Sequence, residues 1–447
     1  MAFLFMVNYP FIFAFMRKWI SISIDDRDEQ FERKLYRMVR AFKYAVILVD
    51  KYPFYNDNPH HYKAFDLLAG FDAIDVVNDS VAHLDRVVNS FSDWYLGYFS
   101  FDFKNDLEPL LTTSHPDKIG FRRFSFFRPR FLVKRVGGNW YVGYNTHWDS
   151  RKSCDDFIRH IAQMVVNPGE LPAVDFKFNM SKNQYLHSVE KLKSHIRRGD
   201  IYEVNFCMEL FTKVAGLDTA FLFDKLLKVA PMPFSTLVRD NDAFLIGASP
   251  ERYLRKKGAK IISQPMKGTA GRSNDRETDL DLMRSLSESE KERAENIMIT
   301  DLVRNDLSRS AARGTVKVDE LCHVLPFPGV YQMISTVSCQ LHPDAHWLDP
   351  LKNSFPMGSM TGAPKIKALH LIDKYEKSAR GLYSGTVGYI TPELDFDFNV
   401  VIRSFLYNQL NGYLSFPVGS AITDACNAHD EYQECLLKAG AINNIFS

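Results

Sequence analysis

Two pairs of glutamates recur at helical spacing in the second half of the sequence. Glu292 and Glu295 lie three residues apart in the segment ERAENIMITDLVRNDL. Glu431 and Glu434 have the same spacing in EYQECLLKA, and Lys438 follows one turn later on the same face. If two such helices converge, their carboxylates form an oxygen-rich site of the kind that binds Mg²⁺. The alternative is a pair of solvated helix faces, which spacing alone leaves open.

Three glycine-containing turns offer places where the backbone can approach a ligand, namely SQPMKGTAGR, FPMGSMTGAPK and FPVGSAI. The second reads G-x-x-x-G-x-x-K and therefore lacks the spacing of a phosphate-binding P-loop. Lys267 stands in the first turn. A lysine at this place is either a nucleophile or an exposed loop residue, and the pattern alone does not decide between them.

The segments that position these residues come in blocks of helices and strands. Helical spacing of apolar residues predicts helices over 28–48, 183–200, 276–307 and 429–442. Strand-like runs lie at 94–103, 122–136, 139–144, 201–210, 243–249, 259–266, 381–390, 397–409 and 412–422. Because strands and helices do not alternate strictly, the sequence predicts an α+β fold with large antiparallel sheets.

Composition narrows the class of protein. Of 447 residues, 46% are hydrophobic and 24% charged, which is typical of a soluble globular chain. The 55 basic and 54 acidic residues nearly cancel, so we expect no nucleic-acid partner. The six cysteines lack zinc-ligand spacing and fit a reducing compartment, which predicts a cytoplasmic protein.

The first residues form an apolar run that is too short to span a bilayer, so we expect no membrane association. The basic residues come after this run, on the wrong side for a signal peptide. We therefore expect 1–15 to be a non-native or disordered extension, with Met16 as the physiological start and ISISI as a strand. An Asn-Pro-Gly sequence predicts a boundary between an N-terminal region, 16–174, and a second region, 175–447, that holds the candidate site.

Eight motifs occur in a fixed order along the second region: GDIYEVNF, SPERYL, QPMKGTAGR, ERAENIMITDLVRNDL, FPMGSMTGAPKIKALHLID, RGLYSGTVGYI, FNVVIRSF and EYQECLLKA. Together they resemble the chorismate-utilising enzymes, a family that includes anthranilate synthase component I, aminodeoxychorismate synthase component I, isochorismate synthase and salicylate synthase. The resemblance implies a multilayered fold of large antiparallel sheets flanked by helices, like that of anthranilate synthase component I. It also implies chorismate as substrate and Mg²⁺ as cofactor.

The resemblance assigns roles to the acidic residues. Glu295 and Glu434 match the family's metal carboxylates, and Glu431 and Glu292 are expected as outer partners that hold coordinated water. Lys438 would assist the ring carboxylate of chorismate. This is chemically sensible, because Mg²⁺ would neutralise that carboxylate and draw electrons from the ring.

Other matches concern the second carboxylate of chorismate, on its enolpyruvyl group. We expect it to meet Arg403, Tyr383 and the backbone N–H near Gly419, with Thr361 and Gly362 lining the pocket. The planar guanidinium of an arginine can hold a carboxylate through two hydrogen bonds. The alternative for Arg403 is a structural ion pair.

Lys267 distinguishes among family members. Its turn resembles that of aminodeoxychorismate synthases, whereas anthranilate synthases generally carry Ala there. The resemblance implies that the Lys267 amine attacks C2 while the C4 hydroxyl leaves, after which ammonia attacks C4. This route needs a neutral amine, and we expect burial and nearby Mg²⁺ to lower its pKa. Glu251 matches an acidic residue proposed to shuttle protons.

Two further positions bear on the chemistry. Isochorismate and salicylate synthases use a lysine to activate water where this sequence has Glu203. A carboxylate there argues against those activities, although it could in principle serve as a base. Gln332 stands where the family often has His, and a side-chain amide cannot act as a general acid. Protonation of the leaving hydroxyl then falls to Glu251, to a water or to polarisation by the metal.

The sequence contains no recognisable glutaminase, so we expect nitrogen to come from a separate glutamine amidotransferase subunit or from free ammonia. Within enzymes the alternative is anthranilate synthase component I. The alternative of another class is a degenerate member that only binds a partner or regulator. Gln332 favours that reading, while Lys267 and Arg403 oppose it.

Overall fold

The computed structural model describes residues 17–24, 28–54, 62–166, 169–440 and 442–446. Strands form most of the interior, and every strand pairing in the described part is antiparallel. The strands are, in order, β1 (Arg17–Ile22), β2 (Tyr44–Val49), β3 (Leu67–Val77), β4 (Tyr95–Phe99), β5 (Phe124–Val136), β6 (Asn139–Asn145), β7 (Lys177–Phe178), β8 (Glu203–Lys213), β9 (Phe234–Asp240), β10 (Ala243–Ser249), β11 (Arg252–Lys257), β12 (Lys260–Gln264), β13 (Met266–Gly271), β14 (Lys317–Phe327), β15 (Val330–Gln340), β16 (Gly362–Ala363), β17 (Thr386–Ile390), β18 (Phe396–Asn399), β19 (Ser404–Asn408) and β20 (Tyr413–Ile422).

The sheet divides into two arms that start from β5. One arm runs through β3, β2, β9, β10, β19 and β20 to β8, which also pairs with β7 and β16. The other runs through β4, β17, β18, β11 and β12 to β15, which also pairs with β13 and β14. The pairs β2–β9 and β4–β17 join strands from before and after residue 167. The predicted α+β fold with large antiparallel sheets is confirmed.

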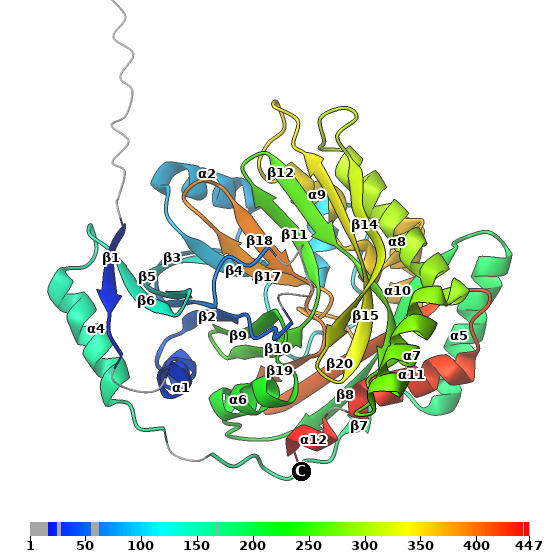
Figure 1. Ribbon diagram of the computed structural model, residues 1–447, viewed down its shortest axis with the longest axis horizontal. Helices are drawn as coiled ribbons and strands as arrows, with labels where there is room; N and C mark the ends of the chain where they lie inside the picture. Colours follow the sequence, from blue (N-terminus) through cyan, green and yellow to red (C-terminus); the bar gives the residue numbers. More distant parts are fainter. Residues whose placement is uncertain (1–16, 25–27, 55–61, 167–168, 441, 447) are drawn as a thin grey trace, which may run out of the picture.

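Helices lie on the outside of these arms (Figure 1). Helix α8 packs on β13, β14 and β15, whereas α11 packs on β20 and on α5. The helices are α1 (Asp28–Met38), α2 (Val81–Phe91), α3 (Lys104–Leu107), α4 (Arg151–Gln163), α5 (Lys182–Arg197), α6 (Thr219–Val229), α7 (Arg276–Glu288), α8 (Glu290–Ser308), α9 (Asp349–Ser354), α10 (Lys365–Tyr375), α11 (Ala428–Gly440) and α12 (Asn443–Phe446), and the short 3-10 turns are η1 (Val39–Ala41), η3 (Phe101–Phe103) and η4 (Gly358–Met360).

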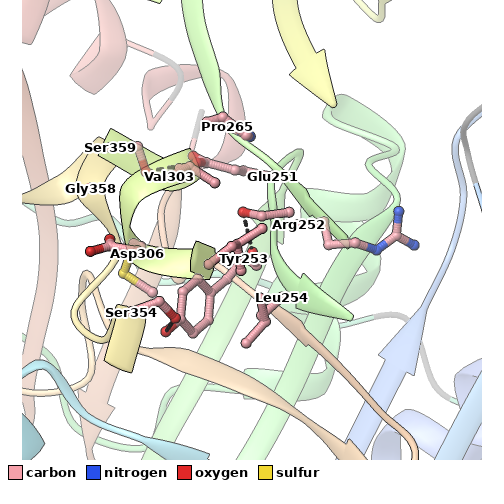
Figure 2. Close-up of a pocket in the computed structure, with 13 residues that line it drawn as sticks. Glu251, Arg252, Tyr253, Leu254, Pro265, Val303, Asp306, Ser354, Gly358 and Ser359 are labelled. Carbon is pink, nitrogen blue, oxygen red and sulfur yellow. Dashed lines mark hydrogen bonds between the residues drawn. The ribbon is translucent and has the colours of Figure 1, made fainter. Parts of the chain in front are cut away.

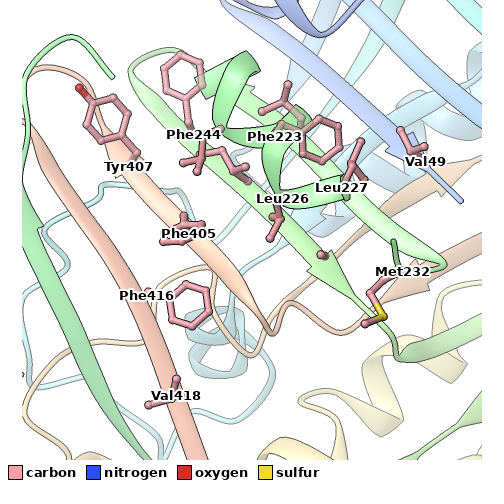
Figure 3. Close-up of a cluster of buried hydrophobic side chains, with 14 of the residues drawn as sticks. Val49, Phe223, Leu226, Leu227, Met232, Phe244, Phe405, Tyr407, Phe416 and Val418 are labelled. Carbon is pink, nitrogen blue, oxygen red and sulfur yellow. The ribbon is translucent and has the colours of Figure 1, made fainter. Parts of the chain in front are cut away.

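Each arm has an apolar core. In the first arm, α6 packs on β10, and its Phe223 and Leu226 belong to the same buried cluster as Phe405 and Phe416 on β19 and β20 (Figure 3). The rings of Phe405 and Phe416 lie 4.7 Å apart between centroids. Because each buried aromatic side chain removes a large apolar area from water, this packing fixes α6 on the sheet. A second buried cluster follows the other arm and includes Phe126.

Three predicted elements differ from the structure. The helix expected over 28–48 ends at Met38, and Tyr44–Val49 forms the buried strand β2. The helix expected over 276–307 is interrupted at Ser289, whose hydroxyl accepts a hydrogen bond from the backbone N–H of Glu292 and so begins α8. The strand expected over 397–409 is interrupted as well and forms β18 and β19.

Two other expectations concern the ends and divisions of the chain. Residues 1–15 and the start at Met16 lie outside the described residues. Strand β1 covers the first part of the predicted ISISI strand. The division at residue 174 stays a prediction. In the described part of the chain, no helix has the length and apolar character needed to cross a bilayer.

Arg380 joins three buried segments. Its guanidinium donates to the Glu376 carboxylate at 2.6 and 3.0 Å, to the carbonyl of Met360 at 2.7 Å and to that of Asn205 at 2.8 Å. Replacing Arg380 by Leu would leave Glu376 as an uncompensated buried charge. We expect a loss of about 3–5 kcal/mol in the free energy of unfolding, measured by urea denaturation.

The matched control is Arg151→Leu. Arg151 pairs with Asp155 at 2.9 Å, but on an exposed helix face. Its loss should change the free energy of unfolding by no more than about 0.5 kcal/mol. Equal losses in the two variants would contradict the importance assigned to the buried pair.

Candidate active site

The two arms meet at a contact between Lys267 and Glu203. The Nζ atom of Lys267, on β13, donates to Oε1 of Glu203, on β8, at 3.0 Å. The Lys267 side chain is 14% exposed and that of Glu203 is 2% exposed. Lys267 is therefore not a solvated loop lysine, because its amine is paired in the protein interior.

Helix α8 approaches this lysine closely because residue 268 is glycine. Gly268 has φ +98°, and a Cβ atom there would lie 3.1 Å from Oε2 of Glu292 and 3.2 Å from Cβ of Met333. On the same helix, the amide of Asn296 donates to the carbonyls of Lys267 and Met333, each at 3.1 Å. The turn and the helix are thus fixed against each other.

The surroundings of Lys267 are strongly acidic. Burial alone would lower the pKa of Lys267, but the carboxylates of Glu203, Glu295 and Glu434 outweigh burial, and the pKa is raised. The sequence analysis expected a lowered pKa for Lys267, and for the protein groups alone this prediction is wrong. In their presence the amine is held as an ammonium ion.

Glutamates from α8 and α11 act on one another. Burial, followed by repulsion from Glu292 and Glu203, raises the pKa of Glu295. Burial also raises the pKa of Glu431, and Glu434 and Glu295 add to this rise. The two acidic helix faces therefore lie within electrostatic reach of each other, on the side of the sheet that carries Lys267.

Lysines occupy the space between these carboxylates. Nζ of Lys291 is 4.0 Å from Oε1 of Glu295 and 3.8 Å from Oε1 of Glu431, so it links α8 to α11. Its position four residues before Glu295 was a readable signal that the sequence analysis missed. Within the ranges that the structure describes, no three or more His, Cys, Asp or Glu side chains are arranged so that they could hold a metal ion.

Lys438 is engaged by protein groups. Its Nζ atom lies 2.6 Å from Oε1 of Glu434 and donates to the carbonyl of Gly419 at 2.8 Å. Burial would raise the pKa of Glu434, yet Lys438 outweighs it and the pKa is lowered. Glu434 is thus ionised and already paired with a cation.

Glu251 lies at the start of β11 and is buried. Its Oε1 atom accepts a hydrogen bond from the Ser359 hydroxyl at 2.7 Å, and Figure 2 shows the two side chains directed toward each other. Burial raises the pKa of Glu251 to about 7, although Ser359, Lys267 and Arg403 oppose the rise. A carboxyl with this pKa can both take up and release a proton near neutral pH.

The cavity drawn in Figure 2 is lined by Glu251 and Ser359 together with Tyr253, Val303 and other residues. Its lining includes neither Lys267 nor any of the four glutamates on α8 and α11. Ser359 lies 108 residues from Glu251 in the chain, so no sequence signal joined them.

Arg403 lies in the connection between β18 and β19, with φ +51°. Burial lowers the pKa of Arg403, against the opposing charge of Glu251. No ion pair or hydrogen bond of the Arg403 guanidinium with other described residues is present, so the structural ion pair considered above is not formed there. The guanidinium is available to bind an anion.

Tyr383 and Gly419 both lie next to the side chain of Cys207. Burial and the neighbouring Cys207 thiol raise the pKa of Tyr383 well above its usual value, so the phenol stays neutral. A Cβ atom at Gly419 would lie 2.7 Å from the Cys207 sulfur, which leaves space for glycine only.

Thr361 and Gly362 pack against the strand that carries Glu203. The Thr361 hydroxyl donates to the carbonyl of Met357 at 3.1 Å, and its own carbonyl accepts from the N–H of Asn205 at 2.7 Å. A Cβ atom at Gly362 would collide with the backbone of Glu203. These two residues therefore hold Glu203 in place, and their role in lining a substrate pocket stays a prediction.

Gln332 lies beside Thr269 across β15 and β13. The Thr269 hydroxyl donates to Oε1 of Gln332 at 3.2 Å, whereas Nε2 of Gln332 is buried and has no hydrogen-bond partner in the described part of the chain. An amide donor left in this way costs about 1–3 kcal/mol. Gln332 can therefore donate a hydrogen bond, but it cannot act as a general acid.

The chain is similar in sequence to a known family and to several characterised proteins. A family described as chorismate binding enzyme matches residues 34–444 of the chain. Aminodeoxychorismate synthase component 1 of Salmonella typhimurium is 36% identical over 264 residues, 59% of this chain and 58% of that protein. Anthranilate synthase component 1 of Thermus thermophilus is 35% identical over 267 residues, 60% of this chain and 57% of that protein. The aligned segment is less than two thirds of either relative.

Solved structures have the same architecture. Anthranilate synthase component I from Streptococcus pneumoniae superposes with a TM-score of 0.70 and 26% identity, over 77% of this chain and 79% of that chain. The menaquinone-specific isochorismate synthase from Escherichia coli gives 0.78 and 17% identity, over 97% and 94% of the two chains, a likeness of fold alone. The predicted likeness to anthranilate synthase component I is confirmed.

Replacing Glu251 by Gln tests the environment of this carboxyl. Its pKa is about 7 in the folded chain against the usual 4.5, so its contribution to stability is complete below the lower value and is lost as the pH rises through the higher one. Relative to Glu251→Gln, the wild type should lose about 2 kcal/mol of unfolding free energy between about pH 5 and pH 8. Urea denaturation at several pH values measures this difference, and a difference that does not vary with pH would contradict it.

Proposed function

The chain belongs to the chorismate-binding enzyme family, and from that premise we propose that it converts chorismate to 4-amino-4-deoxychorismate. The observation that carries the proposal is the position of Lys267, whose amine is buried, paired with Glu203 and surrounded by carboxylates. A nucleophilic lysine at this place accounts for amination at C4 with retention of the enolpyruvyl group. The relative from Salmonella typhimurium bears the corresponding name.

Arg403 and Tyr383 suit the enolpyruvyl carboxylate. Arg403 is partly desolvated and keeps its donors unengaged by other described residues, so an incoming carboxylate would not have to displace a protein partner. Tyr383 is buried as a neutral phenol and can donate one hydrogen bond. The backbone near Gly419 would complete this end of the site.

Mg²⁺ fits the chemistry of the acidic helices. Oxygen donors of this kind suit a hard cation. Burial, with repulsion between the glutamates added to it, raises the pKa values of Glu295 and Glu431, and a cation would relieve both effects. Glu295 and Glu434 would hold the ion, with Glu431 and Glu292 around it, once Lys291 and Lys438 release them. When bound, the ion would neutralise the ring carboxylate of chorismate.

Lys267 and Glu251 would perform the covalent steps. The Lys267 amine attacks C2, the two ring double bonds shift, and the C4–O bond breaks. Ammonia then forms a bond to C4, and the bond between Nζ and C2 breaks. Glu251, with a pKa of about 7, is suited to move protons beside this reaction.

A separate glutamine amidotransferase subunit would supply the ammonia. The names of the first relatives contain "component 1", which fits a two-component enzyme. All six cysteines are buried free thiols, in agreement with a reducing cytoplasmic compartment.

Anthranilate synthase component I is the second candidate, because the Thermus thermophilus relative is nearly as similar as the Salmonella typhimurium protein. Lys267 opposes it, since anthranilate formation requires no lysine adduct. A degenerate binding protein is a weaker alternative, favoured only by Gln332.

Incubation of the full chain with chorismate, Mg²⁺ and an ammonium salt tests the proposal. We expect 4-amino-4-deoxychorismate, identified by mass spectrometry, and no product without chorismate. Fluorescent anthranilate would instead identify the second candidate. Mg²⁺-dependent binding of chorismate without turnover would identify a degenerate binding protein.

The substitution Lys267→Ala tests the nucleophile. With ammonia withheld, the wild type should accumulate a covalent chorismate-derived adduct on Lys267 that intact-mass and peptide spectrometry detect, and the variant should form none. Lys257→Ala is the matched control, because Lys257 is an exposed lysine on β11, a strand of the same arm. Equal adduct yields in the wild type and in Lys267→Ala would exclude Lys267.

A further inference from the structure

Glu203 is the protein group in direct contact with the amine of Lys267. Their 3.0 Å hydrogen bond joins Nζ to Oε1, and both side chains are largely shielded from water. Other acidic groups act on this lysine through space, namely Glu251, Glu292, Glu295 and Glu434. Of these carboxylates, Glu203 is the one that can take a proton from Nζ directly, through an existing hydrogen bond.

Among the residues that the structure describes, the second oxygen of Glu203 finds no hydrogen-bond partner. Oε2 is fully buried, although a carboxylate oxygen normally accepts hydrogen bonds in a protein interior. An orphan acceptor of this kind carries a desolvation cost of about 1–3 kcal/mol or more for a charged group. Such a cost is typical of a group that is completed by a ligand or that takes up a proton during a reaction.

The backbone holds this carboxylate firmly. Residues Glu203 and Val204 pair with Ala363 and Gly362 of β16, and the absence of a side chain at Gly362 allows the two backbones to approach closely. Glu251, in contrast, directs its carboxyl toward the Ser359 hydroxyl. The two carboxyls therefore have different partners and are free to have different tasks.

We propose that Glu203 is the base that takes a proton from the Lys267 ammonium and so frees the amine for attack on C2, an inference that rests on the proposed function. One N–H bond of Nζ breaks, and the proton moves to the Glu203 carboxylate. The freed lone pair bonds to C2, the ring double bonds shift, and the C4–O bond breaks. The oxygen leaves as water with a proton from Glu251, and the adduct nitrogen retains the positive charge.

The second half of the reaction also balances. Ammonia bonds to C4 and takes the positive charge, the double bonds shift back, and Lys267 leaves as a neutral amine. That amine then takes back the proton from Glu203, which restores the ammonium–carboxylate pair, and the new ammonium group on C4 gives one proton to the Glu251 carboxylate. Glu203 thus acts on the nucleophile, and Glu251 acts on the leaving group.

Glu203→Gln is the decisive variant, because its amide oxygen can still accept a hydrogen bond from Nζ but cannot take up the proton. Without ammonia, we expect adduct formation on Lys267 to slow by about 100-fold, followed by rapid quench and mass spectrometry. KM for chorismate should change by less than about threefold. Glu203→Asp, which retains a carboxylate, should recover part of the rate.

Glu209→Gln is the matched control. Glu209 lies on the same strand, is buried, and likewise has one oxygen without a partner, but its other oxygen bonds Ser415 and Tyr413 instead of Lys267. Its adduct rate should stay within about threefold of the wild type. Circular dichroism and thermal unfolding of each variant verify that it is folded.

Several outcomes would overturn the proposed role of Glu203 as the base for Lys267. Adduct formation in Glu203→Gln at the wild-type rate or faster would mean that Glu203 only keeps Lys267 charged. An equal loss of adduct rate in folded Glu209→Gln would mean that the loss comes from a disturbed strand β8 and not from the missing Glu203 carboxylate. In either case the wild type would still form 4-amino-4-deoxychorismate and the proposed function would stand. A wild-type chain that forms neither adduct nor product would end both.

Discussion

Compensation of buried negative charge is the constraint on which this site depends. Five glutamates from β8, α8 and α11 come together, and nearby lysines compensate their negative charge. Removing carboxylates from water is expensive unless opposite charges and hydrogen bonds accompany them. The Glu203–Lys267 pair is the most enclosed, while the more exposed Lys291 and Lys438 pair with Glu431 and Glu434. A dense anionic cluster is thus maintained without unfolding the helices that carry it.

The sheet supplies the geometry for this balance. Strand β5 starts both arms, and the distant ends of these arms bring β8 beside β13. The two helices rest on those ends, α8 on β13 and β15, and α11 on β20. Residues that are far apart in the chain therefore converge through pairings that individually are ordinary antiparallel contacts. Glycine at 268 and 362 permits the closest approaches.

Much of the fold was readable because local patterns decide it. Strand β10 has the predicted bounds, and α5 and α11 lie within a few residues of theirs. The failures occur where tertiary context decides, as when the apolar end of an expected helix became β2 inside the sheet. Motif resemblance predicted which residues form the site, but not how they pair with one another. Neither the raised pKa of Lys267 nor its contact with Glu203 follows from spacing.

The lysines of the site differ in how firmly they are held. Lys291 is about half exposed and lies 3.8–4.0 Å from its two carboxylates, whereas Lys267 is enclosed at hydrogen-bond distance. Mobile ions screen the first arrangement and scarcely reach the second. The rim of the cluster is therefore a region of exchangeable counter-ions, while its centre is insulated. A change in ionic strength would therefore alter the interactions of Lys291 with its carboxylates and leave the Glu203–Lys267 pair almost unchanged.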